Sequence, residues 1–154
     1  MVVVEDLLDK WNQISSVPYQ LVTFRSFDAN NDPIYHTDCV MSIISNHVLI
    51  CLDAIKDIEE KKKVISSLTD ESNPHPFQII ELSYDEINGM CSNVFNVRNE
   101  DDKNVLIMSE RARRSYRETT RRTLEENYII VSAKIDTIEE LGGGSARCLL
   151  AEKY

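Results

Sequence analysis

The sequence predicts an α/β fold made of repeated strand-strand-helix-strand (ββαβ) units, and three observations support this prediction. Stretches with strand composition alternate with amphipathic helical stretches along the chain. The tripeptide Val-Leu-Ile occurs twice, at 48–50 and 105–107. A helix-capping pattern also occurs twice, 53 positions apart, as Ser83, Glu86 and Gly89 and then as Asp136, Glu139 and Gly142. A period of about 55 residues indicates a supersecondary unit that is used more than once.

The first half of the chain is expected to form one complete unit. In order, we expect a helix at 6–14, a strand at 19–24, a turn at 28–33, a hairpin of strands at 35–44 and 47–52, a helix at 57–68, a loop at 69–76 and a strand at 77–82. The strands are rich in β-branched and aromatic residues, and the second hairpin strand is apolar enough for burial on both faces. Asp57 and Glu60 form a capping pair for the helix that follows them.

The second half repeats this order. We expect a short helix between Ser83 and Gly89, a hairpin of strands at 93–98 and 104–108, an arginine-rich helix at 109–127, a strand at 128–133, a short helix at 136–142 that Asp136 caps and Gly142 ends, and a final strand at 146–151. The chain then holds about two and a half units. Residues 1–154 are expected to form one partial domain of this kind.

Composition places the chain among globular proteins with one domain. It has 154 residues, 42% of them hydrophobic, and 17 basic against 26 acidic side chains give a net charge of −9. The longest apolar run is far short of the roughly 20 residues of a membrane helix. The start of the chain lacks the basic and apolar pattern of a secretory signal. We therefore expect a cytoplasmic protein with reduced cysteines and no membrane or nucleic-acid partner.

The arginine-rich helix allows a second interpretation. Six arginines lie between positions 111 and 122, and such a cluster is also found in nucleic-acid-binding patches. Four glutamates between 110 and 126 interleave with them. This pattern favours a solvent-facing helix with ion pairs along its surface.

Three polar residues occupy comparable places in successive units. His36, Asn93 and Cys148 each lie near the start of the first strand of a unit, or in the turn before it. Equivalent positions in units arranged round an axis point to a common centre. The repeat therefore predicts that these three side chains converge.

Cys148 follows three consecutive glycines and Arg147. One interpretation is a nucleophile, because glycines let a ligand approach the backbone and a neighbouring cation favours the reactive thiolate. The other is that Gly142 ends a helix and Cys148 is a small core residue, as most free cysteines are. The other three cysteines are expected to be core residues.

His36 lies two residues before Asp38, so both side chains are expected on the same face of a strand. Such a pair suits an imidazole that transfers protons beside a carboxylate that binds a cation. A surface histidine at the start of a strand is the alternative. Three scattered histidines predict no metal site, and no cofactor is expected.

Several segments together resemble the amidinotransferase, or guanidinium-modifying pentein, superfamily, and most of all its citrulline hydrolase and arginine deiminase-like branch. The resemblance covers essentially the whole chain, but only the carboxyl-terminal half of such a protein. The segments that carry it are 19–24 with Asp28, 33–38, 48–53, 93–97, 107–109 and 137–152.

The resemblance implies a role for each candidate residue. Cys148 matches the nucleophile that attacks the central carbon of a guanidinium or ureido group. His36 matches the histidine that protonates the leaving amine and then activates water. Asp38 matches an acid that holds the cationic nitrogens of the substrate, although the citrulline branch more often has Asn there. Asn93 and Arg147 are expected to support substrate binding.

The chain also departs from the family, whose members build a ring of five units and take further substrate-binding acids from the amino-terminal half. Two hypotheses follow. The chain is either a hydrolase of an arginine- or citrulline-like substrate that needs a complementary half, or a noncatalytic relative that binds a cationic amino acid or a partner chain. A second copy or a complementary chain is expected to cover the open sheet edge.

Overall fold

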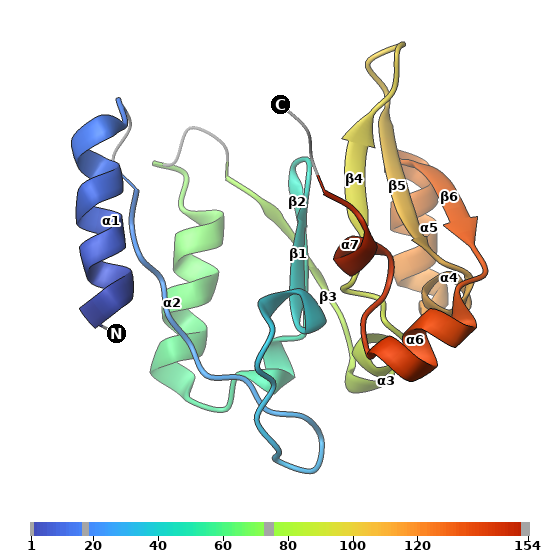
Figure 1. Ribbon diagram of the computed structural model, residues 1–154, viewed down its shortest axis with the longest axis horizontal. Helices are drawn as coiled ribbons and strands as arrows, with labels where there is room; N and C mark the ends of the chain where they lie inside the picture. The colour runs from blue at the N-terminus through green and yellow to red at the C-terminus, as the bar shows by residue number, and fades with distance from the viewer. Residues whose placement is uncertain (1, 17–18, 73–75, 152–154) are drawn as a thin grey trace.

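The chain folds into two ββαβ units that lie side by side (Figure 1). The computed structural model describes residues 2–16, 19–72 and 76–151. Each unit is a three-stranded sheet in which two strands form an antiparallel hairpin and the third lies parallel to the second. The parallel strand is reached through helix in both units, so the repeated unit predicted from the sequence is present twice.

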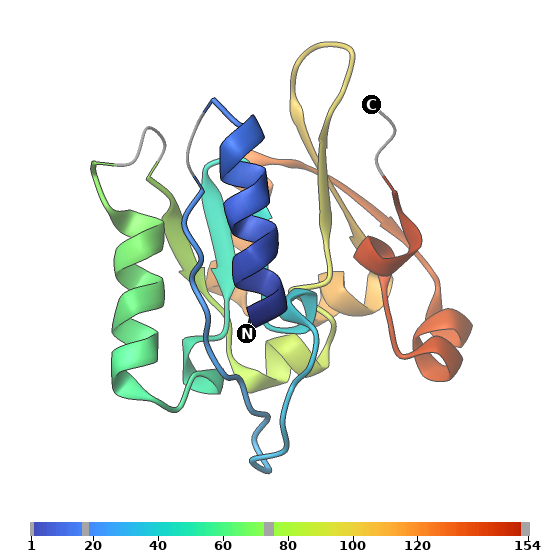
Figure 2. The same ribbon diagram turned by 60° about the vertical axis from the view of Figure 1, so that its left-hand side comes forward.

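The first unit contains β1 (Met41–Ile44), β2 (His47–Ile50), α2 (Ile58–Thr69) and β3 (Gln78–Glu81). The second contains β4 (Phe95–Arg98), β5 (Asn104–Ser109), α4 (Glu110–Ser115), α5 (Glu118–Asn127) and β6 (Ile129–Ala133). The other helices are α1 (Val2–Ile14), α3 (Tyr84–Asn88), α6 (Asp136–Gly142) and α7 (Ala146–Leu149), with short 3-10 turns at Thr37–Cys39 and Leu52–Ala54. Figure 1 shows α1 and α2 at one end of the molecule and β6 with α6 at the other, and Figure 2 shows α1 from the side, in front of the first sheet.

Two apolar clusters hold these elements together. Val48 and Ile50 pack with Val64 and Leu68 of α2 on one face of the first sheet. Leu49, on the other face, joins a larger cluster that includes the second sheet and both α4 and α5. The second unit therefore covers the first sheet, and β2 is buried on both faces as its composition predicted.

The Val-Leu-Ile repeat is out of phase with this packing by one residue. In the first unit, α2 packs on Val48 and Ile50 of β2. In the second unit, the residues of β5 that pack in the cluster with α4 and α5 are Leu106 and Met108. The structurally equivalent offset is thus 58 positions and not the 57 of the tripeptide. A shift of one residue moves a side chain to the other face of a sheet, so the matching letters do not mark matching faces.

The capping predictions are largely confirmed. The Asp57 carboxylate accepts hydrogen bonds from the Glu59 and Glu60 amides, and Ser83 forms a complete capping box with Glu86. Glu60 does not complete a box with Asp57, because its carboxylate binds the backbone amide and the Nε of Arg25 instead.

The expected cap of the last short helix is wrong in two respects. Asp136 lies inside α6, whose first cap residue is Ile135 and has no side-chain hydrogen bond. The helix runs through Gly142, and Gly143 ends it with a left-handed φ of 70°. That conformation favours glycine because the Cβ of another residue would come too close to its own backbone.

Two predicted strands are absent, and one is much shorter than expected. Residues 19–24 are extended without a partner strand, and residues 146–151 begin with the helical turn α7. The strand expected at 35–44 is reduced to β1, because the turn at Thr37–Cys39 comes before it. Residues with high β-propensity form a strand only where another strand lies beside them to share backbone hydrogen bonds. Part of the expected loop at 69–76, residues 73–75, lies outside the described residues.

The predicted helix at 109–127 is divided into α4 and α5 at Tyr116, which has extended backbone angles. The Tyr116 ring is buried and its hydroxyl donates to the Cys91 carbonyl at 2.5 Å. Because the Tyr116 ring is anchored in the core, the helix is interrupted at this residue and the chain changes direction. Of the helices in the described ranges, none is long and apolar enough to cross a membrane.

A buried carboxylate joins the two units where α3 meets α5. Glu86 is fully buried and accepts hydrogen bonds from the backbone amides of Ser83 and Arg117, at 2.9 and 3.0 Å. The Arg117 guanidinium pairs with the same carboxylate at 2.8 Å. Burial raises the pKa of Glu86, but hydrogen bonds from Ser83, Arg117 and Thr120 outweigh it and hold the pKa below its usual value.

Replacing Glu86 with Gln tests this joint. We expect the free energy of unfolding near neutral pH to fall by about 2 kcal/mol, because hydrogen bonds to a charged group are lost. The lowered pKa means that the contribution of Glu86 is complete above the ordinary carboxyl pKa and is lost as pH falls through the lowered value. Urea denaturation between about pH 7 and pH 3 measures both proteins. If the difference in the free energy of unfolding between the unaltered protein and Glu86→Gln does not shrink toward acid pH, this role is contradicted.

Candidate active site

Three side chains from distant parts of the chain meet at one point of the surface. The Asn93 Nδ2 donates to Asp38 Oδ2 at 3.0 Å and lies 3.1 Å from the Cys148 Sγ. The Cys148 thiol donates to the same Asp38 oxygen at 3.2 Å. A carboxylate, an amide and a thiol therefore share one small site.

Asp38 is positioned by the turn before β1. The amide of Cys39 donates to the His36 carbonyl, and the amide of Val40 donates to the Thr37 carbonyl. These bonds close a single 3-10 turn. The half-buried Asp38 side chain within that turn reaches across to the second unit.

Asn93 is buried two residues before β4 begins. Its Oδ1 accepts a hydrogen bond from the Arg147 backbone amide at 3.0 Å, while its Nδ2 faces Asp38 and Cys148. Every polar atom of this buried side chain is thus satisfied, which fixes its orientation. Asn93 ties the end of the chain to both units.

Cys148 lies on α7, the helical turn that replaces the expected final strand. A Cβ at Gly144 would stand 2.9 Å from the Cys148 Cβ and 3.0 Å from its Sγ. Gly144 is therefore needed for the thiol to sit where it does. Cys148 is exposed, which contradicts its interpretation as a core residue.

The other three cysteines differ from Cys148 in burial. Cys51 and Cys91 are buried, and desolvation raises the pKa of both thiols. Cys39 is half-buried, and its pKa is raised by burial and by the nearby Asp38 and Cys148. Sequence reasoning missed that Cys39 borders the site, although its position next to Asp38 was a signal.

Arg147 lies beside this group, with its guanidinium 4.8 Å from the centre of the Phe95 ring. It lines a cleft of about 340 Å³ together with Thr37, Asp38, Met41, Ser42, Ile43, Val94 and Asn96. The cleft is large enough for an amino-acid-sized ligand. In the described part of the chain, no group of three or more His, Cys, Asp or Glu side chains is arranged to hold a metal ion.

His36 does not join the three side chains directly. Its imidazole is exposed and makes no hydrogen bond or ion pair with the described residues. The expectation that His36 and Asp38 share one face of a strand is wrong, because the turn at Thr37–Cys39 replaces that strand. His36 is the residue that enters this turn, and so it remains at the edge of the site.

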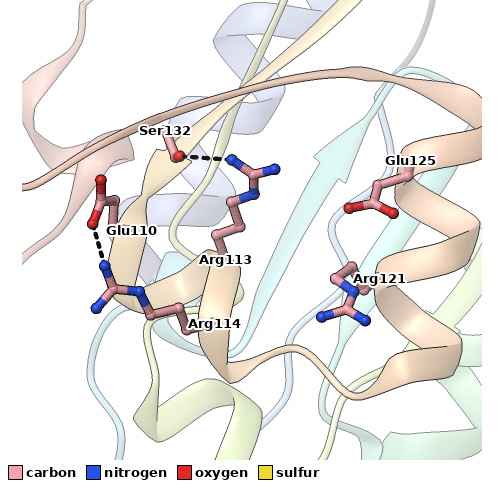
Figure 3. A pocket seen from close by; sticks show the side chains of 6 residues that line it. All are labelled: Glu110, Arg113, Arg114, Arg121, Glu125 and Ser132. Carbon is pink, nitrogen blue, oxygen red and sulfur yellow. Dashed lines mark hydrogen bonds and ion pairs between the residues drawn. The ribbon is translucent and has the colours of Figure 1, made fainter.

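A hollow larger than the cleft beside Arg147 lies elsewhere, between α4, α5 and β6 (Figure 3). It has a volume of about 480 Å³ and is lined by Glu110, Arg113, Arg114, Arg121, Glu125 and Ser132. Arg114 pairs with Glu110 at 2.5 Å, Arg121 pairs with Glu118, and Arg113 reaches Ser132 at 3.4 Å. Two of the four interleaved carboxylates, Glu110 and Glu118, thus pair with arginines along the helices, as their spacing indicated.

Comparison with known proteins identifies the family of this chain. Residues 5–154 match the family described as N,N dimethylarginine dimethylhydrolase, eukaryotic. The chain belongs to this dimethylarginine dimethylhydrolase family. It is therefore a member of the pentein, or amidinotransferase, superfamily, which its sequence motifs resemble. No curated protein matched the sequence.

Two solved structures share the fold. One is ArgZ, an arginine dihydrolase from the ornithine-ammonia cycle in Cyanobacteria, with a TM-score of 0.63 and 18% identity over 94% of this chain. The other is a variant of AgrE in a binary complex with L-arginine, with a TM-score of 0.56 and 15% identity over 75% of this chain. The chain spans only 20% and 15% of the lengths of these two proteins.

Thiol labelling tests the exposure of Cys148. With a neutral reagent such as iodoacetamide, we expect Cys148 to be alkylated first and Cys39 next, because Cys51 and Cys91 are shielded by the core. Mass spectrometry of peptides taken at successive times gives the order. Equal rates at all four cysteines, in protein shown to be folded by circular dichroism, would contradict this arrangement.

Proposed function

We propose that the chain is the nucleophile-bearing part of a hydrolase that acts on the guanidinium or ureido group of an arginine- or citrulline-like substrate. The observation that supports this most strongly is the meeting of Cys148, Asp38 and Asn93 at an exposed position. A thiol that is held against a carboxylate and is open to solvent has the parts needed to attack a cationic carbon.

In the proposed reaction the Cys148 thiolate attacks the central carbon of the guanidinium group and forms a carbon-sulfur bond. The carbon-nitrogen bond to the leaving amine then breaks, and the amine departs with an added proton. Water attacks the covalent intermediate, the carbon-sulfur bond breaks, and a ureido product and the free thiol remain. Proton transfer at the leaving nitrogen and at the water is the part that needs a general acid and base.

Asp38 has the role of binding the cationic nitrogens next to the attacking sulfur. Its Oδ2 lies 3.2 Å from Cys148 Sγ, so a guanidinium held on this carboxylate has its carbon close to the thiol. Charge-assisted pairing of a guanidinium with a carboxylate is strong and directional. Asn93 keeps the carboxylate and the thiol in register, and Arg147 borders the cleft that receives the rest of the substrate.

His36 is proposed as the general acid and base. Its position at the entrance to the turn that carries Asp38 keeps it at the rim of the site, and its exposed imidazole is available to exchange protons. Closer contact with the reacting atoms would come with substrate, since hydrogen bonds of catalytic groups often tighten only in the complex.

We further propose that residues 1–154 form one partial domain, equal to about two and a half units of a five-unit ring. A complementary chain or a second copy would supply the missing side of the site, since a guanidinium bound by one carboxylate in an open cleft is poorly positioned. The free cysteines fit a reducing compartment such as the cytoplasm.

Product release from arginine, citrulline and a methylated arginine tests this function. We expect ammonia or the alkylamine to be released, and Cys148→Ala to abolish the release, because the carbon-sulfur bond cannot form. Cys39→Ala is the matched control and should retain activity. Tight binding of one of these compounds without turnover would instead support the noncatalytic module. Release that persists in Cys148→Ala would exclude the proposed nucleophile.

A further inference from the structure

Glu139 is a buried carboxyl group that is only half satisfied. It is 3% exposed, and its Oε1 accepts a hydrogen bond from Ser145 at 2.5 Å. Its Oε2 is also buried but has no hydrogen-bond partner among the described residues. Leaving a carboxylate oxygen buried and unpaired costs free energy, so a partner for this atom is expected.

The same chain shows what such a partner is like. Glu86 is the buried carboxyl group of α3, the short helix that follows the first sheet as α6 follows the second, 53 residues earlier in the sequence. Its carboxylate accepts a hydrogen bond from the backbone amide of Arg117 at 3.0 Å and forms an ion pair with the Arg117 guanidinium at 2.8 Å. Arg117 stands directly before α5, on the unit that covers the first sheet. One arginine at the start of a packed helix therefore contacts both oxygens of the first carboxylate, in addition to the hydrogen bonds from Ser83.

The second sheet lacks an equivalent cover. The central strand of the first sheet, β2, is buried on both faces, whereas the central strand of the second sheet, β5, is only partly buried at Val105 and Ile107. Beside it, Ile129 and Val131 of β6 are 45% and 48% exposed. Leu141, two residues after Glu139, is 86% exposed. These residues lie at the end of the molecule that carries β6 and α6 (Figure 1). An open apolar face thus adjoins the half-satisfied carboxyl group.

A hollow beside Glu139 leaves room for the missing group. It measures about 340 Å³ and is lined by Arg111, Arg114, Ser115, Asp136, Glu139 and Glu140. The two arginines of this lining are engaged elsewhere, Arg111 with the Asn88 carbonyl and Arg114 with Glu110. Among the described residues, no arginine contacts Glu139 as Arg117 contacts Glu86.

We propose that Glu139 is the docking point for an arginine at the start of a helix in a partner polypeptide, which covers the open face of the second sheet as α4 and α5 cover the first. A second copy of this chain fits less well. The equivalent helix of its first unit, α2, begins at Asp57, whose carboxylate would meet Glu139. This inference deepens the proposed function by describing its complementary chain, but it does not depend on the thiol chemistry.

The first test compares matched substitutions at the two carboxyl groups. We expect Glu139→Gln to leave the thermal midpoint of the full chain unchanged or to raise it, since an uncharged amide costs less to bury than an unpaired carboxylate. Glu86→Gln should lower the midpoint, because Arg117 loses its partner. An equal loss in both variants would show that Glu139 already has a partner within the chain and would overturn the proposal.

The second test uses a fluorescein-labelled peptide with the sequence of residues 109–127 as the probe, because it presents Arg117 at a helix start. Fluorescence anisotropy should show binding to the full chain, weakened about tenfold or more by Glu139→Gln and unchanged by Glu100→Gln, an exposed glutamate outside the lining of this hollow. Replacing Arg117 with Ala in the peptide should weaken binding equally. No binding, or equal binding to Glu139→Gln, would overturn the proposal.

Two controls distinguish a wrong partner at Glu139 from a failure of the proposed function. If sedimentation shows a dimer of the chain that Glu139→Gln dissociates, the occupant is a second copy and the proposed partner is wrong. Alkylation of Cys148 in Glu139→Gln should match that of the unaltered chain. Failure of the docking test with normal Cys148 reactivity therefore leaves the proposed function untouched.

Discussion

The buried amide of Asn93 is the interaction on which the site depends. It joins the turn before β1, the start of β4 and the turn α7 by hydrogen bonds of 3.0 to 3.1 Å. Asp38 belongs to the first unit and Asn93 to the second, so these bonds form only when the two units are packed together. A further bond from the Ser42 hydroxyl to the Val94 carbonyl, at 3.2 Å, fixes the same junction. The position of the thiol is therefore a consequence of how the units pack.

One repeated unit thus serves two purposes in this chain. Turns before the first strand of each unit bring the polar groups of the site together, while the helical side of each unit makes the joint to its neighbour. The joint at Glu86 is closed by Arg117, whereas at Glu139 the described residues leave one buried carboxylate oxygen without a hydrogen-bond partner. A protein built from such units buries its core only where a neighbour is present, because each unit leaves one sheet face uncovered.

Sequence patterns correctly predicted the features that depend on neighbouring residues or on the repeat. They failed where a contact with a distant residue determines the local structure. The capping box at Ser83 and the order of the two units follow from the chain itself. The break at Tyr116 depends on a hydroxyl that reaches Cys91, and strand composition at 19–24 does not reveal that no strand lies beside it. The repeat also predicted that His36, Asn93 and Cys148 converge. Asn93 and Cys148 do so, whereas His36 stays at the edge of the site because the turn at Thr37–Cys39 replaces the expected strand.

The central claim is that Asp38 directs a cationic carbon to Cys148. The most direct measurement is the ratio of the alkylation rates of Cys148 by cationic 2-chloroacetamidine and by neutral 2-chloroacetamide, compared with the same ratio for glutathione. The account predicts a ratio at least about tenfold higher at Cys148, falling to that of glutathione in Asp38→Asn. A ratio equal to that of glutathione in the unaltered chain, or one that Asp38→Asn leaves unchanged, would contradict it.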